Sequence, residues 1–128
     1  MRDFNPKNNY DYSSDLKEII EDGNVKKLNE FCYKYGEKFA KEGLSTSQIR
    51  KIFDTILTMN EYDENYLHLL RPKIAYTVGR HKKKIPIIQE FGKLIEDAIK
   101  MTNEKNFKNF KNFVEALVAY HKFHGGKE

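Results

Sequence analysis

Apolar side chains recur every three or four residues along most of the chain, which is the pattern of amphipathic helices. Gly, Pro, Ser and Asn separate these periodic segments. The predicted helices are a short one ending at Gly23 and further ones over Asn24–Gly43, Ser45–Asn60, Tyr62–Leu70, Pro72–Lys83, Pro86–Ile99 and Asn103–Gly125. No segment alternates apolar and polar residues for long enough to predict a strand. We therefore expect an all-α fold, a compact bundle of about five to six helices.

Local signals sharpen several of these helices. Ser45 and Gln48 have the spacing of a capping box, which predicts a helix that begins directly after Ser45. Thr102 or Asn103 is expected to cap the last helix. Gly36 lies inside a predicted helix, where it costs up to about 1 kcal/mol relative to Ala. We interpret this glycine as leaving room for a close helix crossing.

Pro72 interrupts the helical pattern in the middle of the chain. The segment before Pro72 is expected to bury Tyr66, Leu69 and Leu70 on one side of a short helix. Pro72 disfavours helical geometry at the preceding residue but is well suited to the first turn of a helix. We therefore expect a new or kinked helix to begin near Pro72.

Length and composition limit the class of protein. The chain has 128 residues, a formal net charge of +4 and one cysteine. We assign residues 14–128 to one domain, and the polar residues 1–13 predict a flexible N-terminal tail. The single cysteine rules out an internal disulfide and favours a reducing, cytoplasmic setting. No apolar stretch has the length of a secretory signal core or of the roughly 20 residues that span a membrane.

The sequence carries no strong catalytic pattern. Cys32 continues an apolar helical stripe, so we expect a buried structural thiol rather than a nucleophile. His121 and His124 have the spacing of helical metal ligands, but no acid or cysteine nearby completes a set. We therefore expect no enzyme activity, no bound metal and no cofactor.

The segment between Asn65 and Gln89 contains no Asp or Glu, but it contains six Lys or Arg residues. On a helix that begins at Pro72, one stripe is formed by Lys73, Thr77, Arg80 and Lys84, with Tyr76 beside it. A second stripe, of Ile74, Val78, His81 and Ile85, is expected to pack on the bundle. Such a helix suits phosphate contacts, although charge alone is equally compatible with a solvated basic surface.

Three segments together resemble a known family. They are Leu44–Phe53 (LSTSQIRKIF), Leu70–Arg80 (LRPKIAYTVGR) and Phe113–Lys122 (FVEALVAYHK). In this order and spacing they are similar to the small subunit of the type III-A CRISPR effector, the Csm complex. The resemblance covers roughly residues 44–126, and the second segment is its most specific part.

This resemblance implies a helical, non-catalytic subunit of a ribonucleoprotein complex in antiviral defence. Several copies of such a subunit line the inside of a filament beside the guide RNA and its paired target RNA, and other subunits cut RNA. Carried over by position, the implied RNA-contacting residues are Arg50, Lys51, Arg71, Lys73, Tyr76, Arg80, Lys82 and Lys84. Guide pairing selects the sequence, so such a subunit needs only shape and phosphate contacts.

Two other functions stay open from the residues themselves. A stand-alone helical DNA-binding regulator would use residues 45–60 as its recognition helix, although Arg50 and Lys51 are the only basic residues in that segment. A small metal-dependent hydrolase would use the histidines. A sequence-specific footprint would favour the regulator, and stoichiometric bound metal would favour the hydrolase.

Overall fold

A computed structural model describes residues 11–127, and within these residues every regular element is a helix. The helices are α2 (Ser13–Ile20), α3 (Val25–Lys41), α4 (Thr46–Leu57), α5 (Glu64–His68), α6 (Leu70–His81), α7 (Ile87–Met101) and α8 (Phe107–Phe123). The predicted all-α fold is therefore confirmed. None of the helices in this part of the chain has the length and apolar character needed to cross a membrane.

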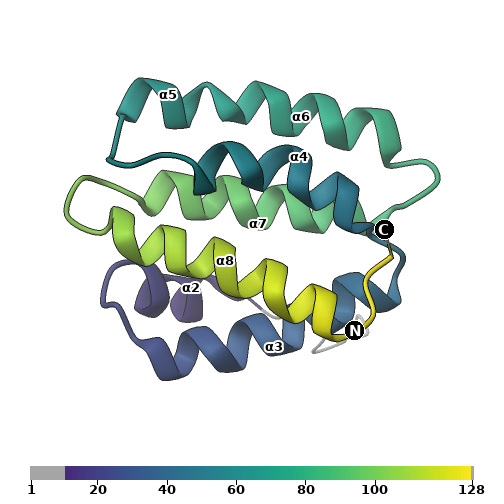
Figure 1. The fold of residues 1–128 in the computed structure, drawn as a ribbon, viewed down its shortest axis with the longest axis horizontal. Helices are drawn as coiled ribbons and strands as arrows, with labels where there is room; N and C mark the ends of the chain where they lie inside the picture. Colours follow the sequence, from purple (N-terminus) through teal and green to yellow (C-terminus); the bar gives the residue numbers. More distant parts are fainter. Residues whose placement is uncertain (1–10, 128) are drawn as a thin grey trace, which may run out of the picture.

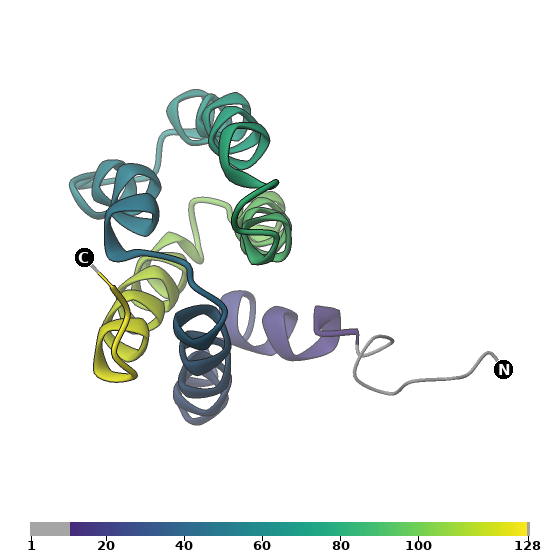
Figure 2. The same ribbon diagram turned by 90° about the vertical axis from the view of Figure 1, so that its right-hand side faces the viewer.

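The helices are arranged around α7 and α8 (Figure 1). Helix α3 packs mainly on α8, and α2 contacts α3, α7 and α8. On the opposite side of the bundle, α5 and α6 form an outer layer, and α6 packs on both α4 and α7. Figure 2 shows this outer layer end-on, with one side of α6 facing away from the rest of the molecule.

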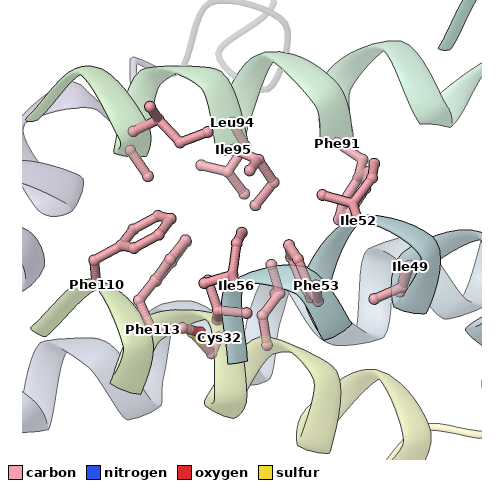
Figure 3. Close-up of a cluster of buried hydrophobic side chains, with 14 of the residues drawn as sticks. Cys32, Ile49, Ile52, Phe53, Ile56, Phe91, Leu94, Ile95, Phe110 and Phe113 are labelled. Carbon is pink, nitrogen blue, oxygen red and sulfur yellow. The ribbon is translucent and has the colours of Figure 1, made fainter. Parts of the chain in front are cut away.

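The core lies where α3, α4, α7 and α8 meet (Figure 3). The rings of Phe53 and Phe91 are 5.4 Å apart, and Phe110 and Phe113 are fully buried beside them. Cys32 is also fully buried, with its sulfur 3.7 Å from the Phe113 carbonyl oxygen. Burial raises the pKa of the Cys32 thiol, because an apolar environment disfavours the thiolate. The prediction of a structural cysteine is confirmed.

The start of α4 follows the predicted capping box. The Gln48 backbone N–H donates to the Ser45 hydroxyl at 3.2 Å, and the Ser45 N–H donates to the Gln48 side-chain oxygen at 2.9 Å. The predicted cap of the last helix is wrong, because α8 begins at Phe107 with Asn106 at the N-cap position. The Thr102 hydroxyl instead donates to the Ala98 carbonyl and completes the end of α7.

The crossing of α3 and α8 depends on Gly36. A Cβ atom at this position would lie 2.8 Å from both the Tyr120 carbonyl carbon and the His121 backbone nitrogen. Real Cβ atoms essentially never come so close to other heavy atoms, so the two backbones can approach this far only at a glycine. The predicted close crossing is confirmed.

The segment before α6 differs from its prediction. Leu67 and Leu70 are buried, whereas Tyr66 is 46% exposed and Leu69 is 65% exposed. Helix α5 has only five residues, which is too short for an apolar period to identify its buried side. Pro72 lies within the first turn of α6 rather than at its start. The N–H groups of a first turn have no partner within the helix, so the missing N–H of Pro72 costs no helical hydrogen bond.

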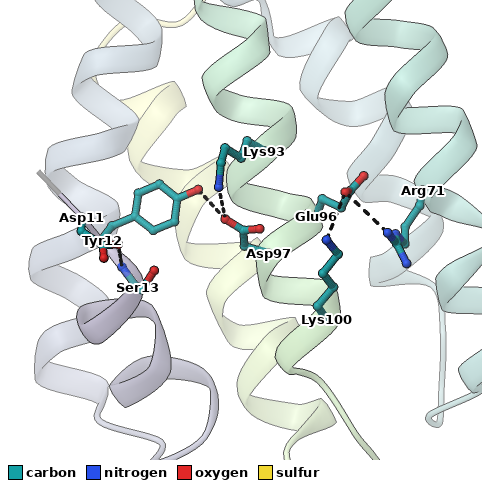
Figure 4. Close-up of polar contacts among 8 residues, drawn as sticks. All are labelled: Asp11, Tyr12, Ser13, Arg71, Lys93, Glu96, Asp97 and Lys100. Atoms are coloured by element: carbon teal, nitrogen blue, oxygen red, sulfur yellow. Dashed lines mark hydrogen bonds and ion pairs between the residues drawn. The ribbon is translucent and has the colours of Figure 1, made fainter. Parts of the chain in front are cut away.

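The predicted tail, residues 1–13, lies outside the described residues except for its last three. Of these, Ser13 is the first residue of α2. The Tyr12 ring packs edge-on against Phe31 at 6.3 Å, and its hydroxyl donates to Asp97 at 2.8 Å (Figure 4). Tyr12 and Ser13 therefore belong to the bundle rather than to the predicted tail.

Candidate RNA-contacting surface

Only a few residues of α6 pack against the rest of the bundle. Leu70 and Ile74 are buried, and Val78 packs partly against the core. Gly92 of α7 permits this packing, because a Cβ atom there would lie 2.6 Å from a Val78 methyl carbon. The remaining side of α6 faces solvent, and it carries Lys73, Tyr76 and Arg80, three of the residues that the sequence analysis singled out.

The solvent-facing side of α6 forms a surface hollow with α4, which we call the α4–α6 hollow. Its volume is about 390 Å³. The residues that line it are Lys51, Pro72, Lys73, Tyr76, Thr77, Arg80 and His81. No carboxylate is among them. The hollow therefore has no negative side chain, and it combines the exposed ring of Tyr76 with the positive charges of Lys51, Lys73 and Arg80.

These three charges come from two helices. Lys51 extends from α4, whereas Lys73 and Arg80 lie two turns apart on α6. Within residues 11–127, none of the three forms an ion pair with a carboxylate. A cation without a protein partner is available to an anionic ligand, so the hollow is suited to phosphate groups.

The other predicted RNA-contacting residues lie elsewhere. Arg50 forms an ion pair with Asp54 on the surface of α4, at 3.5 Å. Lys82 lies beside the groove between α6 and α7. Lys84 follows the end of α6, since the helix ends at His81 and the chain turns there with a hydrogen bond from the Lys84 N–H to the His81 carbonyl. Lys84 is therefore not part of the predicted stripe.

Arg71 faces α7 rather than the hollow (Figure 4). Its guanidinium lies 3.6 Å from Glu96, and the same carboxylate oxygen lies 3.6 Å from the Lys100 ammonium. The Nε atom of Arg71 is buried without a hydrogen-bond partner in the described part of the chain. Arg71 thus connects α6 to α7 through Glu96.

His81 is a lining residue that sequence reasoning missed. The sequence analysis assigned it to the packing stripe, but it is the last residue of α6 and lies at the edge of the hollow. Ile74, Val78 and Ile85 of that stripe do pack on the core. The sequence analysis continued this helix into the run of three lysines after His81, whereas α6 ends at His81.

The C-terminal histidines have structural contacts. The His121 ring is buried, and its Nε2–H donates to the Leu44 carbonyl oxygen at 2.6 Å. Burial lowers the pKa of this imidazole. The His124 ring packs edge-on against Tyr33 at 4.5 Å. No group of three His, Cys, Asp or Glu side chains in residues 11–127 is arranged to hold a metal ion.

These observations define a small helical bundle whose outermost helix presents a basic and aromatic surface. The model of the Csm2 Type III-A family matches residues 22–127, and the chain therefore belongs to this family, as a small subunit of a type III-A CRISPR complex. A curated relative, the CRISPR system Cms protein Csm2 of Streptococcus thermophilus, is 31% identical over 93 residues, which are 66% of this chain and 76% of the relative. No solved structure matches the chain. The resemblance inferred from the three sequence segments is confirmed.

Proposed function

We propose that this subunit is non-catalytic and that several copies form an inner filament of the type III-A complex. The α4–α6 hollow of each copy contacts the phosphate backbone of the guide RNA and of the target RNA paired to it. RNA cutting in this antiviral complex belongs to other subunits.

The observation that carries this proposal is the meeting of Lys51 with Lys73 and Arg80 around one hollow without a carboxylate. Arg80 lies seven positions after Lys73 on the helix, which is about 10 Å along the axis. Cations spread over this distance suit an extended phosphate backbone better than a single phosphate ion. Backbone contacts carry no sequence information, which agrees with a complex in which guide pairing selects the target.

The test is a triple charge reversal, with Lys51→Glu, Lys73→Glu and Arg80→Glu, in the complex assembled with its other subunits and guide RNA. All three side chains are solvent-exposed, so the bundle is expected to stay folded. Each lost phosphate contact reduces the magnitude of the negative slope of log affinity against log salt by about 0.7 for single-stranded RNA, so three lost contacts flatten it by about 2. The loss should be similar for unrelated RNA sequences.

A second triple variant, with Lys26→Glu, Lys105→Glu and Lys108→Glu, is the matched control. It changes the net charge by the same amount at exposed positions away from the hollow. The control is expected to keep the salt slope of the wild type. If both triple variants hold RNA like the wild type at every salt concentration, the hollow does not contact RNA. If both lose RNA equally, only the total charge matters.

A further inference from the structure

Tyr76 is exposed to an unusual degree for an aromatic residue. Its exposed fraction is 69%, and its ring contacts no other aromatic ring in residues 11–127. Phe123 is similarly exposed at 71%, but its ring lies 6.2 Å from Tyr33 and 5.1 Å from His124. Tyr76 thus has an open ring face, and it lies inside the basic α4–α6 hollow.

We propose that Tyr76 stacks on an unpaired base of the RNA strand whose phosphates are held by Lys51, Lys73 and Arg80. This inference rests on the proposed function, and it adds a base contact to a surface otherwise assigned to phosphates. Stacking on an aromatic ring accepts any base, because every base has a π-face. The contact is therefore compatible with a guide RNA of any sequence.

The composition of the hollow favours a nucleotide over a protein segment. On a helix, residues 73, 76 and 80 are spaced by three and four positions, so the ring of Tyr76 lies on the same face as both cations. A ligand for this face needs a flat apolar group and negative charges on both sides of it. A nucleotide within an RNA strand has this arrangement, with its base between two phosphates. The volume of about 390 Å³ leaves room for a base against the ring.

The test uses complexes assembled with wild-type subunit, Tyr76→Ala or Tyr76→Phe. Each guide or target RNA carries 2-aminopurine at one position, and the positions are scanned along both strands. Stacking quenches the fluorescence of this base. We expect at least one position to brighten in Tyr76→Ala but not in Tyr76→Phe, whose ring still stacks. The affinity for that strand falls by about 5- to 150-fold, with an unchanged salt slope because no charge is removed.

Tyr66→Ala is the matched control, because Tyr66 is also an exposed tyrosine without a ring contact in the described residues but does not line the hollow. It should leave the fluorescence at every position unchanged. If Tyr76→Ala brightens no position while the triple charge reversal still weakens RNA retention, the stacking inference is wrong and the phosphate proposal stands. If neither variant changes RNA binding, both proposals fail. If Tyr76→Ala prevents incorporation of the subunit and every fluorescence signal stays unchanged, the ring contacts a protein instead.

Discussion

Replacing Gly36 by Ala tests whether the crossing of α3 and α8 determines the stability of this bundle. In an open helix this change stabilises a protein by up to about 1 kcal/mol, because Gly has the larger conformational freedom in the unfolded chain. At Gly36 the new methyl group would meet backbone atoms of Tyr120 and His121 at 2.8 Å. These atoms can move away only if the whole of α8 moves.

The expected size of the effect follows from these two opposing contributions. Inserting a methyl group into a packed interior typically costs about 1–3 kcal/mol. The upper part of that range applies here, since the neighbours are backbone atoms rather than the ends of flexible side chains. After subtraction of the helix-propensity gain, Gly36→Ala should reduce the free energy of unfolding by about 1–2 kcal/mol. For a domain of this size, each kcal/mol lowers Tm by about 3–5 °C.

Gly79→Ala is the matched control on another helix. Gly79 lies in the last turn of α6, and a Cβ atom there would have no neighbour within 4 Å. The same substitution should therefore raise the free energy of unfolding, by up to about 1 kcal/mol. Thermal melts followed by circular dichroism, together with urea titrations, would measure both variants in the full-length chain.

The opposite signs of the two effects make the reasoning easy to refute. If Gly36→Ala melts at or above the temperature of the wild type, α8 accommodates a methyl group at the crossing. If both variants lose stability equally, the loss does not come from the helix crossing. Only a decrease at Gly36 with an increase at Gly79 supports the packing argument.

Two further predictions concern hydrogen bonds that fix the edges of the bundle. Burial lowers the pKa of His121 below 6.5, so below about pH 6.5 the unfolded chain binds more protons and stability falls as the pH decreases. His121→Gln keeps a donor for the Leu44 carbonyl but cannot titrate, so urea titrations at pH 7.5 and 5.5 should differ less than for the wild type; an equal difference would contradict this. Tyr12→Phe keeps the ring but removes the hydrogen bond to Asp97, which should lower the free energy of unfolding by about 1 kcal/mol. An unchanged urea midpoint would mean that this hydroxyl does not anchor the start of α2.

Local sequence signals were sufficient where neighbouring residues determine the structure. The capping box at Ser45 and the apolar stripes of the long helices involve residues within four positions of one another. The same reasoning failed at α5, where five residues give no period, and Tyr66 and Leu69 are exposed. It also failed at the start of α8, where Thr102, Asn103 and Asn106 are all suitable cap residues. Asn106 lies at the N-cap position there, and its side chain makes no cap hydrogen bond.

The candidate site was predictable in part for the same physical reason. Lys73, Tyr76 and Arg80 lie on one helix, so their common face follows from helical geometry. Their meeting with Lys51 depends on how α6 packs on α4, and no local pattern encodes that packing. The sequence also did not reveal that α6 ends at His81. The predicted helix was therefore too long, and Lys84 was assigned to a stripe to which it does not belong.

The division of charge within Leu70–Arg80 follows from the helix itself. Successive residues turn by about 100°, so Arg71 and Lys73 point about 160° apart around the axis and cannot face the same partner. Because α6 is packed between α4 and α7, one of these cations must turn toward α7, where Glu96 receives Arg71 at 3.6 Å. The burial of Leu70 and Ile74 sets the rotation of α6 about its axis, and the ion pair agrees with that rotation. The rotation in turn leaves Lys73 and Arg80 on the side of Lys51, so residues that do not line the hollow orient those that do.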